Sequence, residues 1–344
     1  MNLAKAQAFL IRKPENIFYM SGLDASEASL LITASSAYLI VDSRYYLMAK
    51  KSRIKTLLLE GNFEDFLKKF LAKKKVGSLA FESNFLTYRK VRNLKKYSSL
   101  KLIEADDWVE SIRQTKTTQE TAILTKAAKL ADKAMAFVKH SISVGITELQ
   151  LAKRIECFIR QSGGRSEAFQ TIVASGPNSA LPHYKSGRRR VCPGDVLLVD
   201  LGAKYGNYVS DITRTFLLEP VASQAKELYL TCLEAQKKAL AKIETGVKLS
   251  EVDSAARLLI EDKYPSKFGH NLGHGLGLEV HESPVIGPKN NSLLAKDTVF
   301  TVEPGIYLEG KGGVRIEDMV LSTSNGFKLL TKSPKELGEV TVEL

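Results

Sequence analysis

The stretch Val196–Leu218, VLLVDLGAKYGNYVSDITRTFLL, holds two apolar runs that each adjoin a carboxylate. The first run ends at Asp200, and the second begins directly after Asp211. Two glycines lie between the runs and permit a tight reversal of the chain, so the stretch predicts a β-hairpin. The separation of 11 residues between Asp200 and Asp211 allows both side chains to reach neighbouring positions on paired strands.

Aspartates that flank a turn are common, so the hairpin alone leaves a structural and a functional interpretation equally open. Asp200, however, directly follows the apolar run Val196–Val199. A carboxylate buried there is costly unless a cation or hydrogen-bond donors meet it. The position of Asp200 therefore favours a binding site.

A second informative segment, Gly273–Glu282, has the sequence GHGLGLEVHE and surrounds an imidazole with glycines. Glycine lets the backbone approach closely and leaves the ring of His274 accessible. A single histidine is more often structural than a ligand. The chain has only five histidines, however, and His270, His274 and His281 lie within 12 positions. This clustering favours a functional site.

Two later segments place further acids on or beside strands. Thr298–Glu303 is typical of a strand that ends in a carboxylate, and Pro304–Gly305 predicts a turn that stops it. Val314–Asp318 opens another apolar run. Because side chains alternate along a strand, we expect Arg315 and Glu317 on one face.

The four segments together supply four carboxylates and one imidazole: Asp200, Asp211, His274, Glu303 and Glu317. This set carries too much negative charge for one divalent ion but suits two ions that share bridging carboxylates. It predicts a dinuclear centre, with manganese as the first choice and cobalt, iron or zinc as alternatives. Two ions about 3.5 Å apart would hold a water between them, lower its pKa and polarise a substrate carbonyl.

The composition is that of an ordinary globular protein, with 44% hydrophobic and 26% charged residues in a chain of 344. A chain of this length predicts two domains. No apolar run approaches membrane-spanning length, so we expect no membrane partner. The three cysteines are far apart and form no CxxC pair, which favours neither a disulfide framework nor a zinc–thiolate site. A cytoplasmic protein is the simplest interpretation.

The polar segment Arg113–Thr118 predicts the domain boundary. Within it, Thr117 pairs with Glu120 in a capping box, which predicts the start of a long helix. Apolar residues recur at three- and four-residue steps as far as about His140. One face of this helix is therefore expected to be buried.

The two domains expected on either side of this boundary are residues 1–113 and 114–344. In the first, strand-like runs such as Ser29–Thr33 and Ala37–Val41 alternate with helical patterns. This alternation predicts a small α/β domain. The second domain also supplies both strands and helices, so the fold class of the whole chain is α/β (α+β).

The net charge of +12 raises the question of nucleic-acid binding. Most of the excess lies in residues 1–113, which carry 20 Lys and Arg against 12 Asp and Glu. The densest basic runs fall on an expected amphipathic helix, Phe63–Lys75, where they are typical of a solvated face. A basic surface alone is nonspecific, so no nucleic-acid partner is expected.

A weak internal repeat of the form E-[LV]-x-x-A-x-R occurs in the second domain. Its two copies, displaced by 103 residues, consist of Glu148, Leu149, Ala152 and Arg154 and of Glu251, Val252, Ala255 and Arg257. Each copy begins shortly after a glycine-bearing turn. The repeat predicts a duplicated α/β unit with a site between its halves.

Four ordered motifs resemble those of the pita-bread metallopeptidases, in the branch of aminopeptidase P and prolidase. They are VDLGAKYGNYVSDITRTF, GHGLGLEVHE, TVEPGIY and GGVRIED. The resemblance covers nearly all of the chain. It implies a creatinase- or prolidase-like N-terminal α/β domain over residues 1–113 and a duplicated pita-bread catalytic domain over residues 114–344.

The resemblance also implies roles for the five candidate ligands. Asp200 would chelate one metal, and Asp211 and Glu317 would bridge both. His274 and Glu303 would complete the second metal. Glu303 is in addition the general base that the resemblance implies.

Four further residues resemble the substrate-binding groups of that branch. His183 and His281 match the histidines that hydrogen-bond the peptide and the developing oxyanion. His270 and Arg315 match supporting positions around the proline pocket and behind the ligands. Without the resemblance, His183 would be interpreted as an ordinary loop histidine.

The implied activity is metal-dependent hydrolysis of the Xaa-Pro bond. The main expectation is an aminopeptidase that releases the N-terminal residue from peptides with proline in second place, and the alternative is an Xaa-Pro dipeptidase (prolidase). The segment Ser283–Val285 favours the first, because several prolidases have an arginine there that would bind a terminal carboxylate. Arg188, Arg189 and Arg190 could supply that cation instead.

Other relatives fit less well. Methionine aminopeptidases carry different residues at Thr213-Arg214 and Gly305–Tyr307. A non-catalytic peptide-binding or nucleic-acid-binding relative would have lost ligands, whereas all five are present here. The expected partners are peptides with proline in second place, and a homodimer is expected because dimers are common among the relatives.

Overall fold

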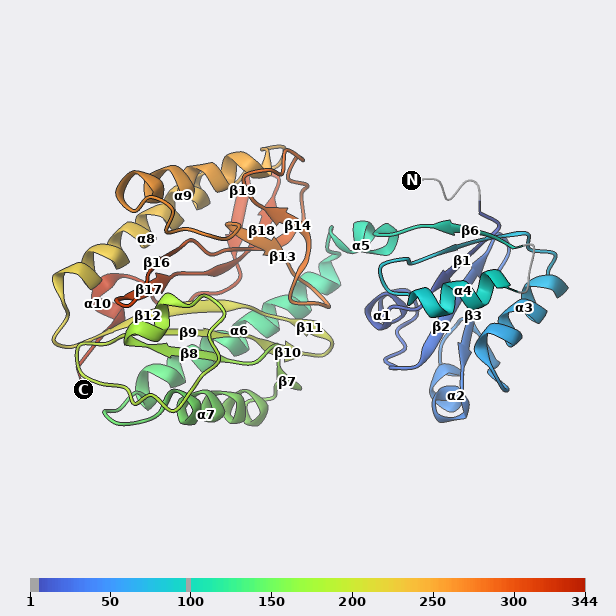
Figure 1. Cartoon of the computed structure of the whole chain (residues 1–344), viewed down its shortest axis with the longest axis horizontal. Coiled ribbons are helices and arrows are strands. Elements are labelled where there is room, and N and C mark those ends of the chain that lie inside the picture. The colour runs from blue at the N-terminus through green and yellow to red at the C-terminus, as the bar shows by residue number, and fades with distance from the viewer. Residues whose placement is uncertain (1–5, 97–99, 344) are drawn as a thin grey trace. The chain divides into compact units, whose positions relative to one another are not determined.

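The computed structural model describes residues 6–96 and 100–343. The chain divides into two compact units, residues 1–113 and 114–344, which we call the N-terminal and the C-terminal unit (Figure 1). No helix in these two described ranges is both long enough and apolar enough to cross a membrane.

The N-terminal unit is built on a mixed six-stranded sheet in the order β4-β3-β2-β1-β5-β6. The predicted strands at Ser29–Thr33 and Ala37–Val41 are confirmed as β2 and β3, which pair antiparallel. Side chains alternate along β1, so that Phe9 enters one hydrophobic cluster and Leu10 the other. The strands are β1 (Ala8–Ile11), β2 (Ala28–Thr33), β3 (Ala37–Val41), β4 (Lys55–Leu58), β5 (Ser78–Phe81) and β6 (Lys101–Glu104).

Five helices accompany this sheet in the described part of the unit. The predicted amphipathic helix is α3, which ends at Lys73 and buries Leu67 and Leu71. Its lysines lie outside this buried face, as the sequence pattern predicted. The helices are α1 (Pro14–Ser21), α2 (Ser43–Ala49), α3 (Phe63–Lys73), α4 (Tyr88–Lys96) and α5 (Trp108–Arg113).

The C-terminal unit begins with the long helix that the capping box predicts. The Thr117 hydroxyl accepts a hydrogen bond from the backbone N–H of Glu120, whose side chain accepts one from the N–H of Thr117. In Figure 1, α9 and α7 lie along opposite edges of this unit, with strands between them. The helices are α6 (Thr118–Ser141), α7 (Glu148–Gln161), the 3-10 helix η2 (Gly176–Ala180), α8 (Ser223–Ala241), α9 (Leu249–Lys263) and α10 (Leu337–Val340).

Two sheets form the centre of this unit, in the orders β20-β12-β9-β8 and β14-β13-β15-β18-β19. Two smaller sheets have the orders β11-β10-β7 and β16-β17. The strands of the first half are β7 (Ser166–Glu167), β8 (Ile172–Ser175), β9 (Val196–Leu201), β10 (Ala203–Tyr205), β11 (Tyr208–Val209) and β12 (Ile212–Leu218). The later strands are β13 (Gly273–Gly275), β14 (Glu282–Ile286), β15 (Val299–Val302), β16 (Gly305–Leu308), β17 (Gly312–Arg315), β18 (Asp318–Thr323), β19 (Gly326–Leu329) and β20 (Thr341–Val342).

The predicted hairpin in Val196–Leu218 is formed by β9 and β12. The two strands pair antiparallel, and Asp200 lies opposite Thr213. Gly206 turns the chain between β10 and β11 with a positive φ of 59°. At Gly202 any Cβ would overlap the carbonyl oxygen of Ser210. The two glycines therefore serve different needs, a turn and a close backbone approach.

The internal repeat is present, but its register differs from the prediction. The N–H of Gly145 donates to Val191 O, and the N–H of Gly246 donates to Leu294 O, each at 2.9 Å. The helices that follow begin at Glu148 and Leu249, 101 residues apart. The predicted displacement of 103 residues is therefore wrong by two at the helices, because the motif matched helix composition rather than the turns that precede the helices.

A break in one hairpin replaces the turn predicted at Pro304–Gly305. β15 pairs with β18, and β16, which begins at Gly305, pairs with β17 in a different sheet. The chain thus passes between sheets at Glu303–Pro304 and returns at Ile316–Glu317. The predicted end of the strand is confirmed, since β15 stops at Val302, but the predicted turn is absent there, because proline interrupts the ladder and the chain continues into another sheet.

Candidate metal centre

The five candidate ligands lie at the ends or breaks of strands in the C-terminal unit. Asp200 is in β9, Asp211 directly precedes β12, and His274 is in β13. Glu303 and Glu317 occupy the two sides of the hairpin break. Segments that are separated by up to 117 positions in the sequence therefore meet at one place.

Distances within this group are short. Oxygen or nitrogen atoms of Asp211, His274 and Glu317 all lie within 4.8 Å of one another. His274 Nε2 is 3.8 Å from Asp211 Oδ2 and 3.2 Å from Glu303 Oε1. Asp200 joins the group electrostatically, because its charge contributes to raising the pKa of Asp211.

The buried acids strongly perturb one another. Burial, followed by the charges of Glu317 and Asp200, raises the pKa of Asp211 well above its ordinary value. Burial, followed by Glu303 and Asp200, does the same for the pKa of Glu317. Glu303 behaves in the opposite way: burial opposes its ionisation, but the hydrogen bond and charge of His274 lower its pKa to about 2. The cluster thus holds more anionic groups than the protein neutralises.

Two oxygens in the cluster test whether it fits metal ions. Asp200 Oδ1 and Asp211 Oδ1 are buried, and neither has a hydrogen-bond partner within residues 6–96 and 100–343. Buried carboxylate oxygens of this kind are normally paired or coordinate a cation. Carboxylates with one imidazole form the hard donor set that divalent ions prefer. The residues present therefore fit a divalent metal centre.

Thr213 and Arg315 form hydrogen bonds with Glu317 and Asp200. The Thr213 hydroxyl donates to Glu317 Oε2 at 2.6 Å and accepts from Arg315 Nε at 3.1 Å. Arg315 and Glu317 thus contact the same side chain, although Glu317 lies beyond the end of β17, where strand alternation does not apply. Arg315 Nη2 also donates to Asp200 Oδ2 at 2.6 Å, so that one oxygen of Asp200 is held while the other is left open.

A chain of hydrogen bonds continues from Arg315 to His270. Arg315 Nη1 donates to the Tyr307 hydroxyl at 2.9 Å, and this hydroxyl lies 3.0 Å from His270 Nε2. Burial, partly opposed by the charge of Arg315, raises the pKa of Tyr307 to about 12. Tyr307 therefore stays protonated and can donate to His270.

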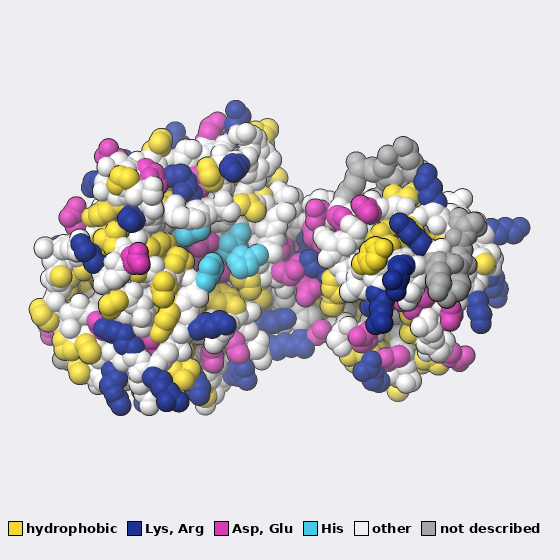
Figure 2. Space-filling view, viewed as in Figure 1, with side chains coloured by type: hydrophobic (Ala, Val, Ile, Leu, Met, Phe, Trp, Pro, Cys, Tyr) yellow, Lys and Arg dark blue, Asp and Glu magenta, His cyan; other side chains and the backbone are white. Residues whose placement is uncertain are grey.

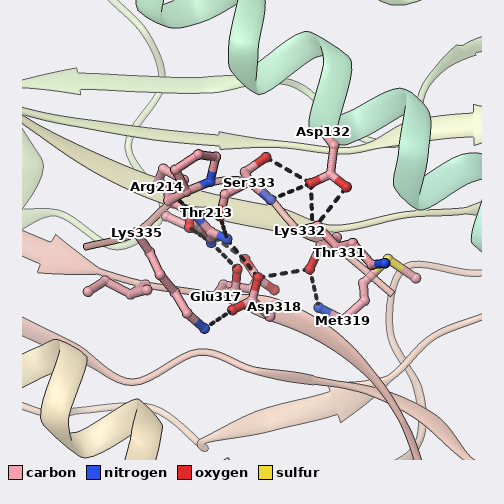
Figure 3. Close-up of polar contacts among 12 residues, drawn as sticks. Asp132, Thr213, Arg214, Glu317, Asp318, Met319, Thr331, Lys332, Ser333 and Lys335 are labelled. Atoms are coloured by element: carbon pink, nitrogen blue, oxygen red, sulfur yellow. Dashed lines mark hydrogen bonds and ion pairs between the residues drawn. The ribbon is translucent and has the colours of Figure 1, made fainter. Parts of the chain in front are cut away.

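A second buried network fixes the backbone beside Glu317 (Figure 3). Arg214 Nη1 donates to the carbonyl oxygen of Glu317 at 2.6 Å, and Nη2 donates to Asp318 Oδ1 at 2.7 Å. Lys335 Nζ donates to the other oxygen of Asp318 at 2.5 Å. Burial disfavours the charge of Asp318, but Arg214 and Lys335 outweigh it and lower its pKa. Asp318 is therefore an ionised anchor next to a candidate ligand.

This network extends to α6 through Asp132. Its carboxylate accepts hydrogen bonds from the backbone N–H groups of Lys332 and Ser333 and from the Ser333 hydroxyl, at 2.7–2.9 Å (Figure 3). Ser333 O in turn accepts from Arg214 Nη2 at 2.7 Å. The first helix of the unit thereby braces the segment that carries Lys335.

A cavity of about 660 Å³ is bordered by Tyr307, which Arg315 connects to Asp200 of the metal centre. Its lining includes His183, His270 and Tyr307, together with apolar residues such as Leu181 and Pro182. Figure 2 shows histidine side chains exposed together near the centre of the C-terminal unit, beside hydrophobic surface. The structure therefore places His183 and His270 at an apolar pocket of the size that binds small ligands.

His281 lies beside His274. The two rings are 4.3 Å apart between centroids, in an edge-on arrangement. Burial, followed by the charge of His274, lowers the pKa of His281. His281 is thus neutral near pH 7 and can donate a hydrogen bond.

Sequence reasoning missed two buried acids that position these histidines. Glu148 accepts hydrogen bonds from the Ser175 hydroxyl, Asn178 and the Tyr184 hydroxyl at 2.7–3.0 Å. It thereby fixes the loop that carries His183. Its place at the start of a predicted helix made it resemble an ordinary N-terminal acid, so no local signal marked it.

The other missed acid is Glu282. Its Oε1 accepts from the backbone N–H groups of Leu278 and Glu279, and its Oε2 lies 3.3 Å from Lys116 Nζ in a buried ion pair. This carboxylate closes the loop that carries His281. The adjacent His-Glu pair in the sequence was a signal, but its distant partner Lys116 could not be inferred from spacing.

The three arginines that sequence analysis offered as carboxylate binders lie elsewhere. Arg189 pairs with Asp195 at 2.6 Å, and Arg190 Nη1 donates to Gly145 O at 2.7 Å. Neither these two nor Arg188 belongs to the described lining of the cavity. They therefore do not supply the missing cation there.

We expect metal binding to release protons, because metal ions and protons compete for the same buried oxygens. Asp211 and Glu317 have raised pKa values, so they hold protons at pH values where ordinary carboxyl groups are ionised. The apparent affinity for manganese should therefore rise with pH. Calorimetric titration of chelator-treated protein, in two buffers of different ionisation enthalpy, measures the protons released.

The same shifts predict how the metal-free protein responds to pH. A carboxyl group with a raised folded-state pKa binds more protons in the folded than in the unfolded state, so stability falls as pH rises above its unfolded-state pKa of about 4. Glu303 acts in the opposite sense, and its stabilisation is lost only as pH falls from 4.5 towards 2. Metal binding without proton release just above the ordinary carboxyl pKa of about 4 would contradict this account.

Comparisons with known proteins agree with this geometry. Residues 122–324 match metallopeptidase family M24, and residues 1–115 match the creatinase/prolidase N-terminal domain. The chain is 40% identical over 340 residues to an Xaa-Pro dipeptidase of Pyrococcus horikoshii, covering 98% of this chain and 96% of that protein. It is 39% identical over 330 residues to an Xaa-Pro dipeptidase of Pyrococcus furiosus, covering 95% and 94%.

Solved structures give the same result. An Xaa-Pro dipeptidase from Bacillus anthracis matches with a TM-score of 0.96 at 36% identity, over 100% of this chain and 96% of that one. An X-Pro aminopeptidase from Thermotoga maritima matches with a TM-score of 0.90 at 38% identity, over 98% of each chain. Because the first family match spans all five converging side chains and the second precedes it, the chain belongs to the metallopeptidase family M24, with its pita-bread fold, and is a hydrolase.

Proposed function

We propose that the protein hydrolyses the Xaa-Pro bond of dipeptides. The observation that carries this proposal is the cavity lined by His183, His270 and Tyr307, which is apolar enough to take a proline ring. Arg315 connects Tyr307 in its wall to Asp200 of the metal centre. Two relatives that match over nearly the whole chain are named Xaa-Pro dipeptidases. These relatives support the alternative of the sequence analysis better than its main expectation of an aminopeptidase.

The proposed ligands are the five residues that converge, namely Asp200, Asp211, His274, Glu303 and Glu317. Two divalent ions, with manganese as the first choice, would be held there. When bound, such ions activate water and polarise the scissile carbonyl. The open oxygens of Asp200 and Asp211 support this assignment.

The remaining polar groups have roles that their geometry supports. Glu303 is ionised at neutral pH, so its carboxylate can accept a proton from the attacking water. His281 is neutral and can donate to the developing oxyanion. His183 and His270 line the pocket and can hold the peptide in place. Arg315 keeps Asp200 and Tyr307 in position.

A second candidate function is the Xaa-Pro aminopeptidase. The specific observation in its favour is the match to the X-Pro aminopeptidase of Thermotoga maritima at 38% identity. The two functions share the same chemistry and differ in whether the substrate continues beyond proline. The length of the preferred substrate therefore separates them.

The test compares an Xaa-Pro dipeptide with the matching Xaa-Pro-Gly tripeptide, using manganese-supplemented protein. We expect kcat/KM to be at least about tenfold higher for the dipeptide, a preference that corresponds to about 1.4 kcal/mol. An Xaa-Ala dipeptide controls for proline preference, and chelator-treated protein controls for metal dependence. A higher kcat/KM for the tripeptide would identify an aminopeptidase instead.

A further inference from the structure

The wall of the cavity carries one strong cation. Of the described residues that line it, Lys267 is the only lysine or arginine, and Glu309 is the only acid. Both side chains are exposed to solvent. Within residues 6–96 and 100–343 the Lys267 ammonium forms no ion pair, so its charge is available to a ligand.

A hydrogen bond connects the backbone of Lys267 to the side chains behind the metal centre. The carbonyl oxygen of Lys267 accepts a hydrogen bond from the N–H of Tyr307 at 3.1 Å. The Tyr307 hydroxyl contacts Arg315, whose guanidinium holds Asp200. Lys267 and a candidate metal ligand are therefore connected through two side chains. Lys267 lines the same cavity as Tyr307 and His183.

A dipeptide substrate carries a carboxylate close to its scissile bond. In an Xaa-Pro dipeptide the terminal carboxylate belongs to the proline itself, so it lies within one residue length, roughly 3.5 Å, of the scissile bond. A tripeptide has a neutral peptide group at this point. Recognition of the carboxylate therefore selects dipeptides, and a lysine ammonium forms a charge-assisted hydrogen bond with it.

Other cations do not meet this requirement. Arg189 and Arg190 are occupied by Asp195 and Gly145. Val285, at the position where an arginine was considered in the sequence analysis, is apolar and lies in β14. Among the described lining residues only Lys267 combines a positive charge with access to the cavity.

We infer that Lys267 binds the terminal carboxylate of the substrate and sets the preference for dipeptides. This inference rests on the proposed dipeptidase function and goes beyond it by naming the group that recognises chain length. Glu309, on the same wall, repels the carboxylate and limits the affinity that Lys267 provides. Lys267 is thus a specificity-determining residue that takes no part in bond cleavage.

The experiment uses the full-length, manganese-supplemented protein and three substrates: an Xaa-Pro dipeptide, its C-terminal amide and the Xaa-Pro-Gly tripeptide. In Lys267→Gln we expect KM for the dipeptide to rise about tenfold, the size typical of one charge-assisted hydrogen bond, with kcat nearly unchanged. KM for the amide and the tripeptide should stay within about twofold, because these substrates have no carboxylate at that point.

Two variants control the interpretation. Lys267→Arg keeps the charge and should restore most of the affinity for the dipeptide. Glu309→Gln removes the opposing charge on the same exposed wall, and KM for the dipeptide should fall. Thermal unfolding of all three variants should match the wild type, since both residues are exposed.

The outcomes separate the inference from the proposed function. If the wild type prefers the tripeptide, the dipeptidase proposal fails and the role of Lys267 fails with it. If the wild type prefers the dipeptide but Lys267→Gln changes the dipeptide and its amide equally, only the role of Lys267 is overturned. A selective rise in KM for the dipeptide supports both.

Discussion

Replacing Asp211 by asparagine should lower kcat/KM by at least about 1,000-fold, or about 4 kcal/mol of transition-state stabilisation, while the metal-free protein becomes more stable. The loss follows from the proposed role of Asp211 as a ligand with a buried, open oxygen. The gain follows from charge. Asp211 is 5% exposed and lies against Glu317 and Asp200, so that its charge is repelled in the absence of metal.

Asparagine has nearly the same shape, and its NH2 group can donate to the neighbouring carboxylates. At neutral pH the metal-free protein must either protonate the Asp211 carboxyl or bury its charge, and both cost free energy relative to the ionised carboxyl of the unfolded chain. Asparagine removes this cost, so the free energy of unfolding of the metal-free protein should rise by about 1–3 kcal/mol. Denaturant unfolding with and without manganese measures this change, and peptide hydrolysis measures the loss of activity. Stabilisation of the wild type by manganese should be greatly reduced in the variant.

Asp65→Asn provides a matched control, because Asp65 lies on α3 with its side chain 68% exposed. This substitution should change neither activity nor the effect of manganese. A variant Asp211→Asn that kept near-native activity would remove Asp211 from the metal centre. Lower stability of its metal-free form would contradict the electrostatic argument alone.

The largest loss of stability is expected for Arg214→Met. Arg214 and Asp318 are each 1% exposed at their side chains and pair at 2.7 Å. Removing the guanidinium leaves Asp318 with Lys335 as its remaining cation and takes a donor from the carbonyl oxygen of Glu317. Breaking a buried ion pair in this way costs about 3–5 kcal/mol, because the remaining charge cannot be solvated.

The control for Arg214→Met is Arg160→Met. Arg160 pairs with Glu167 at the same distance of 2.7 Å, but its side chain is 58% exposed. An exposed pair of this kind contributes about 0–1 kcal/mol. Equilibrium unfolding in urea compares the two variants. Similar losses of stability would show that burial does not decide the strength of these pairs.

The sequence predicted those features that depend on neighbours along the chain. The hairpin of β9 and β12 and the capping box of α6 are confirmed, because alternation, glycine positions and the Thr117–Glu120 spacing act over a few residues. The prediction that Asp200 and Glu317 converge rested on the order of the motifs and on the family resemblance. No local pattern fixes the distance between residues 117 positions apart.

The sequence could not predict side-chain contacts between distant segments. Lys116 meets Glu282, and Thr213 links Arg315 to Glu317, through contacts that only the assembled sheets create. The register of the repeat failed for a related reason. Helix composition tolerates a shift of two residues, whereas the backbone hydrogen bonds of Gly145 and Gly246 do not.

Lys267 was also missed. An isolated lysine near the end of a helix has no distinguishing pattern, and its neighbour in space, Tyr307, is 40 positions away. The arginines at 188–190 were more conspicuous in the sequence, but their partners lie away from the cavity. Charge density along a chain therefore does not identify which cation reaches a ligand.

The broken hairpin separates the residues of the metal centre from residues that border the cavity. Glu303 and Glu317 lie at its base, where strand pairing on both sides fixes their positions. Glu309 and Gly310 lie at its tip and border the cavity. Residues can be gained, lost or exchanged at the tip without displacing the acids at the base. Enzymes descended from one ancestral hydrolase can thus change their substrate preference while they keep the same metal-binding acids.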